Sequence, residues 1–380
     1  MIMVNKYLIF FFLLSIGILT SCDENKEAFE EKAKKVERDK MKKEGVIYGS
    51  SQSTYTGKPG QLVVVAENTV FTDELAEILD TTFGALLSPY HYPPHKKFEI
   101  VVLEPERFKE AHLRLRNVLK LKFSDDVPEG QPELLIKKDY HARKQLMVEL
   151  TAENYQDLRD KLLMEAAPLT KLFEELEWKR EFARLKKDNN TVIKSRLKKD
   201  FGITLELPKD ARYEVNKKGN FAKIMFPDRS KQMDLKAGGG DHGAKANFIH
   251  SGLMIWEIPY AKESQFQPAY LLKARDTMLK YNAHHEIPGV YMGTQYHPAV
   301  LPIHTYMQVG SVQGYEFRGF FKFTGRMQPS GGKFWSFHFI HPKRNTIMAV
   351  SGYVDAPPTV NPAFDLRRIQ ACIYSLEITD

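Results

Sequence analysis

Histidine is the residue type most able to give this sequence a chemistry of its own. The chain of 380 residues has 12 histidines, and eight of them lie after residue 240. Imidazole is a common metal ligand and works as a general acid or base near neutral pH. No pair has a diagnostic metal spacing, such as two histidines four residues apart on one helix. A binding site could still assemble through folding from His242, His250, His297 and His304.

A glycine-rich segment, residues 238–243, matches the pattern G-x-G-x-x-G of dinucleotide-binding proteins. That pattern needs a helix directly after it, whereas residues 247–256 have the composition of a strand. The sequence has no serine-nucleophile, Walker or zinc-type motif. Two carboxylates brought together by folding would leave no local signature, so acid–base hydrolysis stays open. We therefore assign no catalytic residue, metal or cofactor, and favour a protein that is not an enzyme.

Cys22 has the most specific chemical role that the sequence indicates. Lys6 is followed by an apolar stretch of about a dozen residues, as in a signal peptide, and this stretch is too short for a comfortable membrane span. Leu19-Thr20-Ser21-Cys22 then resembles the lipobox of bacterial lipoproteins, in which the thiol is diacylated and the chain is cut before it. We expect residues 1–21 to be the signal peptide and Cys22 to be lipidated. The alternative is an ordinary signal peptide with an incidental cysteine.

Composition bounds the class of protein. Hydrophobic residues make up 43% of the chain and aromatic residues 12%, which suits sizeable cores that contain sheet. The net charge of +7 is modest for this length, and an exported protein rarely meets nucleic acid, so we expect no nucleic-acid partner. The second cysteine, Cys372, has apolar neighbours at helical spacing and is expected to be a small buried residue.

The length favours two domains. Residues 22–57 are charged and then rich in glycine and serine, which predicts a tether. Residues 58–188 predict an N-terminal α+β domain that ends in a long helix, residues 189–202 a helical connector, and residues 203–380 a strand-rich C-terminal α+β domain. The predicted fold class is therefore α+β, with two domains whose mostly antiparallel sheets are packed by helices and joined by a basic helical connector.

In the N-terminal half, apolar β-branched runs predict two strands, with a helix beginning at Asp73 between them. We expect a second helix near residues 106–121, followed by a pair of strands. The longest helical pattern covers residues 154–187, and Pro168 should kink this helix or split it in two. Nine cationic residues lie between Lys179 and Lys199. They predict a solvated helix face or, alternatively, a site for an anionic surface or partner.

The C-terminal half is richer in strands. A helix over residues 191–201 should end at Gly202, a residue suited to a helix C-terminus. Residues 213–226 predict a hairpin and residues 268–282 a helix, and two more hairpins follow. A last helix is expected at residues 362–376.

Short segments across the chain share a pattern with known proteins. They are residues 57–65, 274–279, 289–292, 316–321, 331–334, 349–357 and 366–376. Together they resemble an uncharacterised lipoprotein family of the Bacteroidota, a domain of unknown function, and the likeness runs from about Gly57 to the end. The resemblance implies an envelope lipoprotein of that phylum and supplies no catalytic residues. Residues 238–245 and the histidine-rich stretch 297–304 depart from the pattern.

The expected function is non-enzymatic: a lipid-anchored binding or accessory subunit of an outer-membrane complex for assembly, secretion or glycan uptake. Its partners would be the outer membrane, through Cys22, and an envelope protein. The alternative is a hydrolase of envelope or extracellular polymers with its site in the C-terminal domain, and a third class is a lipid carrier. The acidic pair Asp23-Glu24 resembles export signals for the cell surface, so we favour that location over the periplasmic face.

Overall fold

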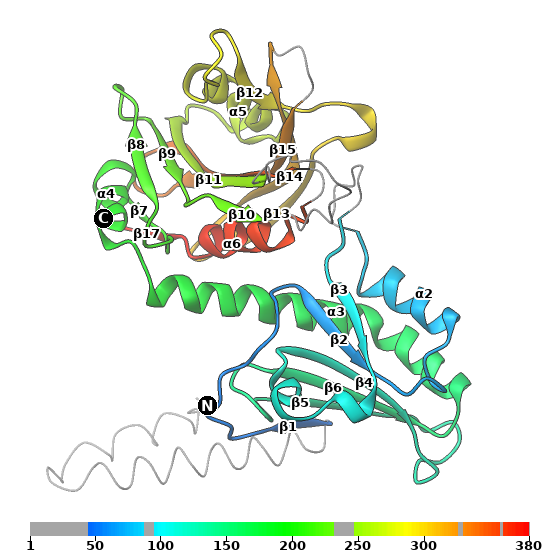
Figure 1. Cartoon of the computed structure of the whole chain (residues 1–380). Helices are drawn as coiled ribbons and strands as arrows, with labels where there is room; N and C mark the ends of the chain where they lie inside the picture. The colour runs from blue at the N-terminus through cyan, green and yellow to red at the C-terminus, as the bar shows by residue number, and fades with distance from the viewer. Residues whose placement is uncertain (1–44, 87–94, 232–246, 326–329, 358–359, 380) are drawn as a thin grey trace, which may run out of the picture.

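The structure, a computed structural model, describes residues 45–86, 95–231, 247–325, 330–357 and 360–379. The predicted signal peptide, Cys22, most of the predicted tether and the glycine-rich segment 238–243 lie outside the described residues. The described chain forms two α+β domains, and its strand pairings taken together are mostly antiparallel as predicted, although the sheet of the N-terminal domain is mostly parallel. In Figure 1 the long helix α3 (Tyr155–Lys187) runs along the boundary between the two domains.

The N-terminal domain is built on a six-stranded sheet of order β1-β5-β6-β4-β2-β3. Its strands are β1 (Val46–Tyr48), β2 (Gln61–Val65), β3 (Glu99–Leu103), β4 (Asn117–Phe123), β5 (Glu133–Lys138) and β6 (Leu146–Ala152). Strand β2 runs parallel to β3 and β4, and β4 runs parallel to β6, whereas β5 and β6 are antiparallel. Parallel neighbours need a crossover, and helix α2 (Asp73–Thr82) provides the one between β2 and β3.

The fold begins earlier than the predicted tether, residues 22–57, allows. Strand β1 pairs in parallel with β5. Thr56 donates its backbone N–H to Arg114 O at 2.8 Å and accepts from Arg116 N at 3.0 Å. Tyr55 lies beneath the Arg116 guanidinium, 4.9 Å from the ring centroid. Glycine and serine made this segment read as flexible, but pairing with distant residues holds it in the N-terminal domain.

The predicted helix near residues 106–121 is wrong. The chain makes two short 3-10 turns, η1 (Pro105–Arg107) and η2 (Glu110–Arg114), and then enters β4. Strand β4 lies between β2 and β6, and its residues Val118, Leu119 and Leu121 are buried. A central strand is apolar on both faces, so pairing with distant strands outweighs the local helical spacing.

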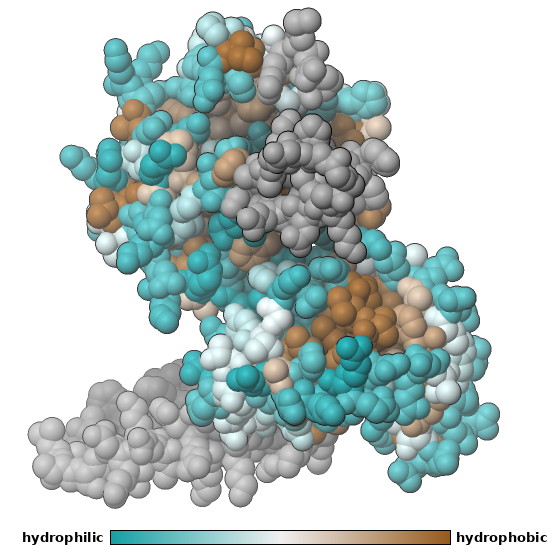
Figure 2. All heavy atoms as spheres, viewed as in Figure 1, coloured by the Kyte–Doolittle hydropathy of each residue, from teal (hydrophilic) through white to brown (hydrophobic). Residues whose placement is uncertain are grey.

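Helices α2 and α3 cover one face of this sheet. Val64, Leu119 and Val148 of the sheet pack there against Leu79 and Phe173 of the helices. Burial of each such side chain stabilises the fold by roughly 1.5–3 kcal/mol. In the space-filling view apolar side chains also gather on the surface of this domain around β2 and β3, while most of the other visible surface is hydrophilic (Figure 2).

Helix α3 is continuous through Pro168, so the predicted split does not occur. Asn154 caps its start by accepting the Asp157 N–H at 2.9 Å. Proline removes the hydrogen bond to the carbonyl four residues earlier, which belongs to Met164. The side chain of Met164 is 64% exposed, so this turn faces the solvent and water can satisfy the carbonyl. The helix therefore tolerates the proline.

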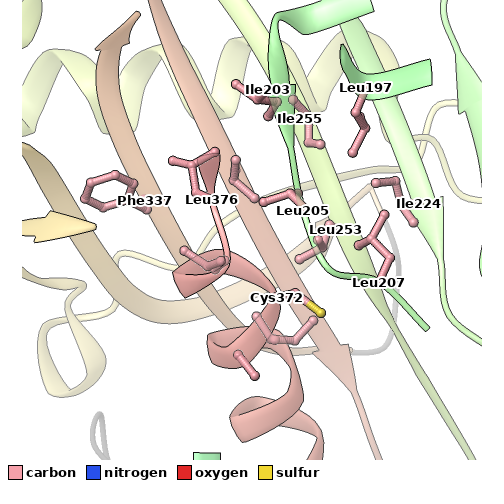
Figure 3. Packing of buried hydrophobic residues seen from close by; sticks show 14 of the residues in the cluster. Leu197, Ile203, Leu205, Leu207, Ile224, Leu253, Ile255, Phe337, Cys372 and Leu376 are labelled. Atoms are coloured by element: carbon pink, nitrogen blue, oxygen red, sulfur yellow. The ribbon is translucent and has the colours of Figure 1, made fainter. Parts of the chain in front are cut away.

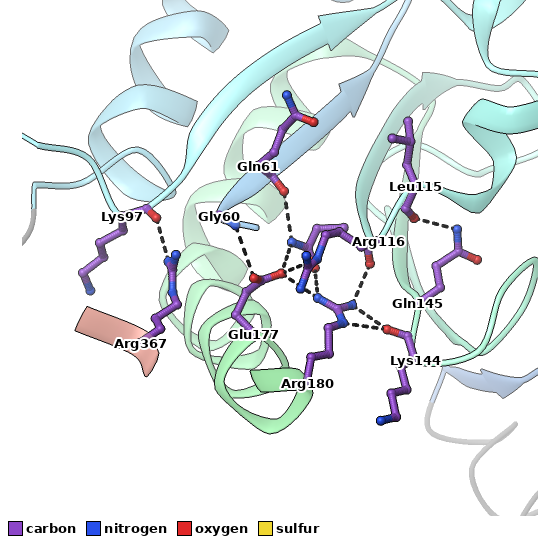
Figure 4. A network of polar contacts seen from close by, with 11 residues as sticks. Gly60, Gln61, Lys97, Leu115, Arg116, Lys144, Gln145, Glu177, Arg180 and Arg367 are labelled. Carbon is purple, nitrogen blue, oxygen red and sulfur yellow. Dashed lines mark hydrogen bonds and ion pairs between the residues drawn. The ribbon is translucent and has the colours of Figure 1, made fainter. Parts of the chain in front are cut away.

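The second half of α3 carries a buried polar cluster at the domain junction (Figure 4). Arg180 donates to Glu177 Oε1 at 2.6 Å and to Asn117 Oδ1 at 2.8 Å, and Arg116 Nε lies 2.9 Å from Glu177 Oε1. Arg367 of the last helix donates to Lys97 O at 2.6 Å. We call these five residues, Arg116, Asn117, Glu177, Arg180 and Arg367, the junction cluster. Arg180 belongs to the run predicted to be a solvated face, and for this residue that prediction is wrong because it is 3% exposed.

The C-terminal domain is built on a nine-stranded sheet of order β12-β14-β15-β16-β11-β9-β8, in which β13 also pairs with β14 and β10 with β11. All of these pairings are antiparallel. The strands are β8 (Arg212–Val215), β9 (Phe221–Met225), β10 (Arg229–Lys231), β11 (Asn247–Pro259), β12 (Tyr291–Thr294), β13 (Ile303–Val309), β14 (Val312–Thr324), β15 (Gly331–His341) and β16 (Thr346–Asp355).

This sheet is apolar on both faces. Leu253 and Ile255 of β11 pack with α4 (Thr191–Phe201) and α6 (Ala363–Tyr374), while Met254 and Trp256 pack with α5 (Pro268–Asn282). Alternate residues of a strand point to opposite faces, so one strand serves two cores. Helix α4 contributes Ile193, Leu197 and Phe201 to the first core, so the predicted connector is also part of the C-terminal domain.

Helix α6 packs closely on the sheet, and Cys372 is buried in this core as predicted (Figure 3). Burial raises the pKa of the Cys372 thiol, which keeps it protonated. A Cβ at Gly352 would come within 2.0 Å of Ile369 Cγ2, so a glycine is needed where the helix crosses β16.

The predicted end of helix α4 at Gly202 is confirmed. Gly202 adopts the left-handed conformation, with a φ of +66°. β7 (Ile203–Thr204) and β17 (Glu377–Ile378) form a two-stranded sheet in the same domain.

Among the described residues, no helix is long and apolar enough to cross a membrane.

We expect acid to destabilise this domain before its carboxylates are protonated. Burial, with a smaller effect of the Arg275 charge, lowers the pKa of His338 from 6.5 to about 3. Between these values the unfolded chain binds a proton that the folded chain excludes, so stability falls as the pH drops below 6.5. From pH 7 to pH 5 the loss is about 2 kcal/mol for this residue. Urea unfolding at pH 7 and pH 5 measures this loss of stability. His338→Gln should remove the contribution of His338 to the loss. The contribution of His341 should remain, because burial also lowers the pKa of that residue. An equal loss in both proteins would contradict the assignment.

Candidate functional site

The predicted histidines do not meet in one place among the described residues. His242 lies outside those residues. His250 is on β11 and His304 on β13, and β16, β15 and β14 lie between these strands. Strand spacing then separates the two residues by about 19 Å along the sheet. His297 precedes η4 (Pro298–Val300) and accepts the Ala299 N–H of its own turn at 3.3 Å. Of the three described histidines, His250 lines a hollow of the C-terminal domain.

That hollow is a groove beside the C-terminal end of α5, formed by two adjoining parts of about 440 Å³ and 950 Å³. The two parts share His250, Phe321, Phe323 and Asp355. We call it the C-terminal groove. Residues from β8, β9, β11, β14 and β16 line it, so it draws on positions scattered over more than a hundred residues of sequence. Pockets of 300–1,000 Å³ that are largely apolar are typical ligand sites.

One wall of the groove is apolar and adaptable. Met225, Met254 and Met292 line it together with the packed rings of Phe321 and Phe323, whose centroids are 5.7 Å apart. Methionine side chains are flexible and polarizable, and they suit surfaces that bind varied apolar groups. This wall can therefore hold the apolar body of a ligand.

The other wall is polar and carries both signs of charge. His250 Nδ1 lies 2.9 Å from Asp228 Oδ1, and both side chains are about half exposed, at 52% and 48%. Asp355 is the direct neighbour of His250 across β11 and β16, which places their Cβ atoms about 5 Å apart. Burial, with the nearby charges of Asp228 and Asp355, raises the pKa of the Tyr353 phenol, so it stays a hydrogen-bond donor. Arg212 and Lys223 add positive charge at the margin.

This arrangement can bind a ligand with an apolar body and a polar, hydrogen-bonding end. The described residues contain no group of three or more His, Cys, Asp or Glu side chains placed to hold a metal ion. An Asp–His pair beside a second carboxylate can also orient a water molecule for general-base chemistry.

The sequence pointed to His250 but missed the rest of the groove. Asp228 follows a hairpin and Asp355 ends a strand, and nothing in their local sequence distinguishes them from other surface carboxylates. Both residues follow predicted strands closely, and side chains at the ends of strands are often exposed. This position was the one feature of the sequence that could have suggested them. Sheet pairing between β11 and β16 then brings residues 228, 250 and 355 together.

The fold is that of a two-domain α+β protein with a groove in its second domain. Two family models match the chain, a domain of unknown function (DUF8532) over residues 55–186 and a domain of unknown function (DUF4837) over residues 190–375. Each half of the chain therefore matches a domain of unknown function, in agreement with the predicted resemblance. The two matches meet where α3 ends. No curated protein matches the sequence.

Solved structures show only distant likeness. LpqN of Mycobacterium tuberculosis, described as involved in cell envelope biogenesis, shares 13% identity and a TM-score of 0.25, over 47% of this chain and 83% of that one. The Ran-binding protein Mog1p of Saccharomyces cerevisiae shares 9% identity and a TM-score of 0.23, over 45% of this chain and 96% of that one. Likeness at this level carries no argument about function.

Proposed function

We propose that this protein is an outer-membrane lipoprotein anchored through Cys22, and that it works as a non-enzymatic binding or accessory subunit of an envelope complex. The single observation that carries the binding role is the C-terminal groove, with its methionine and phenylalanine wall facing a wall of opposite charges. The lipobox-like sequence at Cys22 supports the anchor. The cell surface is our proposed location, with an envelope protein as the partner.

Chain length between anchor and fold limits where the groove can act. The predicted mature chain starts at Cys22, and β1 starts at Val46. Even fully extended, this stretch spans at most about 80 Å. The first strand of the fold therefore stays within this distance of the membrane surface, which leaves room for an envelope partner beside the groove.

A hydrolase is the second candidate, and the pair His250–Asp228 with Asp355 beside it is the observation that favours it. In this reading His250 is a general base that activates water, and Asp228 orients the imidazole. Ser251, next to His250 in the chain, does not suit a nucleophile, because it is 4% exposed and its side chain alternates to the opposite face of β11.

Site-specific photo-crosslinking in intact cells tests the proposal. A benzophenone side chain at Phe248, which lines the groove and is 49% exposed, should give a discrete adduct with an envelope component. The same group at Tyr306, 54% exposed on β13 and outside the groove lining, is the matched control and should give at least tenfold less adduct. Equal adducts at the two positions, or none at either, would contradict a binding role for the groove.

The same experiment separates the two candidates. Asp228→Asn in the crosslinking protein removes the charge beside His250 and keeps the shape of the side chain. A hydrolase that can no longer turn over retains its substrate, so the yield of adduct should rise. A binding site loses an interaction, so the yield should stay level or fall.

A further inference from the structure

A second hollow lies between the two domains. Helix α3 forms one wall, helix α6 another, and strands β14 and β15 of the C-terminal sheet the third. Its volume of about 240 Å³ is below the range of roughly 300–1,000 Å³ for drug-sized ligands, so a ligand here would be small. We call this hollow the interdomain cleft.

Part of the cleft is a rigid aromatic wall. Trp335 of β15 donates its indole N–H to the buried Glu316 at 2.7 Å, and Arg318 stacks on the Trp335 ring with its guanidinium carbon 4.1 Å from the centroid. Glu316 also accepts from Arg318 Nε at 2.8 Å and from the Tyr374 hydroxyl at 2.6 Å. Trp178 of α3 packs edge-on against Tyr374, with ring centroids 6.0 Å apart. The buried carboxylate thus fixes the groups that face the cleft.

The charge of the lining is mostly positive. Its carboxylates, Glu174 and Glu175, each lie near a lysine, Lys97 at 3.4 Å and Lys179 at 3.5 Å. The cations of the lining come from separate parts of both domains: Lys97, Lys171, Arg318, Lys333 and Arg367.

Two of these cations are held away from water. Arg367 is 8% exposed, and its Nη1 has no hydrogen-bond partner among the described residues. Lys333 is 4% exposed, and burial lowers its pKa to about 8, so it is still mostly charged at neutral pH. Arg367 shares the single carboxylate of Glu177 with Arg116 and Arg180, so positive charge is left over and an anion in the cleft would offset it. Arginine also offers a fork of donors that fits the oxygens of a phosphate.

We propose that the interdomain cleft binds a small phosphate-bearing ligand, with its anionic group among Lys171, Arg318, Lys333 and Arg367 and its body against Trp178 and Trp335. Such a ligand would touch both domains and hold them together. The proposal does not depend on the function assigned to the C-terminal groove.

Titration of the soluble chain from residue 23 with inorganic pyrophosphate tests the site, because two of the three tryptophans line the cleft and report directly by fluorescence. Lys171→Gln removes an exposed cation of the lining and should weaken binding about three- to tenfold, the effect of one charge contact. Glu175→Gln removes a lining carboxylate and should strengthen binding by a similar factor. Lys187→Gln, at the far end of the same helix, is the matched control and should leave it unchanged. Opposite signs at positions 171 and 175 are a signature that altered folding would not produce.

Vesicles containing phosphatidylglycerol form the second arm and distinguish a free phosphate from a lipid headgroup. One outcome is that the protein binds these vesicles, that Lys171→Gln weakens this binding, and that pyrophosphate gives no response. This outcome supports the site and shows that its phosphate belongs to a lipid. No response in either arm up to millimolar phosphate, or equal weakening by Lys171→Gln and Lys187→Gln, would overturn the proposal.

Discussion

Glu177→Ala should lower the free energy of unfolding by about 3–5 kcal/mol, the usual cost of removing one partner from a buried ion cluster. Glu177 is 3% exposed and accepts from Gly60 N at 3.2 Å, Asn117 Nδ2 at 2.8 Å and Arg180 Nη1 at 2.6 Å. Burial works to raise the pKa of this carboxyl, but the charges of Arg116, Arg180 and Arg367 outweigh burial and hold the pKa below its usual range. The carboxylate is therefore charged in the folded protein.

The loss is large because the partners of Glu177 stay behind. Arg180 is also 3% exposed, and without Glu177 its charge would be buried with only neutral oxygens around it: Asn117 Oδ1 and the carbonyls of Arg116 and Lys144. Urea unfolding compares the variant with Glu175→Ala, an exposed neighbour on α3 whose pair with Lys179 is worth about 0–1 kcal/mol. A loss below about 1 kcal/mol for Glu177→Ala would show that the junction cluster does not stabilise the domain boundary.

Cys22→Ala should release the protein from the membrane. Each buried methylene of an acyl chain contributes about 0.8 kcal/mol of membrane affinity, and two chains together give a stable anchor. Fractionation of cells should find the natural protein in the membrane fraction and most of the variant outside it. Cys372→Ala is the matched control, because that thiol lies in the core and its loss should not change the fraction. Recovery of Cys22→Ala in the membrane at the natural level would contradict the lipid anchor.

Local signals in the sequence predict several elements of the C-terminal domain well. Helix α5 begins at Pro268, where proline suits a first turn, and ends at Asn282, as predicted. The hairpin of β8 and β9 forms around Gly219, which has a φ of +70° in the turn. These features depend on neighbours within a few residues, so composition and spacing are enough.

Features set by distant pairing were not predictable in the same way. Strand β4 has apolar residues that also fit a helix, and only its place between β2 and β6 decides the outcome. In the junction cluster, Glu177 accepts hydrogen bonds from Asn117 and also from Gly60, and these three residues are far apart in sequence. Arg180 looked like one of many surface cations because its burial depends on the packing of α3 against the sheet. His304 looked like His250, but the strand order separates them.

Affinity purification of the full-length protein from detergent-solubilised native membranes tests the central claim most directly. Phe248→Glu places a charge in the C-terminal groove, and Tyr306→Glu makes the same change at an exposed aromatic residue outside the groove lining. We predict that a stoichiometric envelope component, identified by mass spectrometry, follows the natural protein and Tyr306→Glu and is depleted at least tenfold with Phe248→Glu. Recovery of the same component in equal amounts with all three proteins, or of the natural protein alone, would contradict an accessory subunit that binds through this groove.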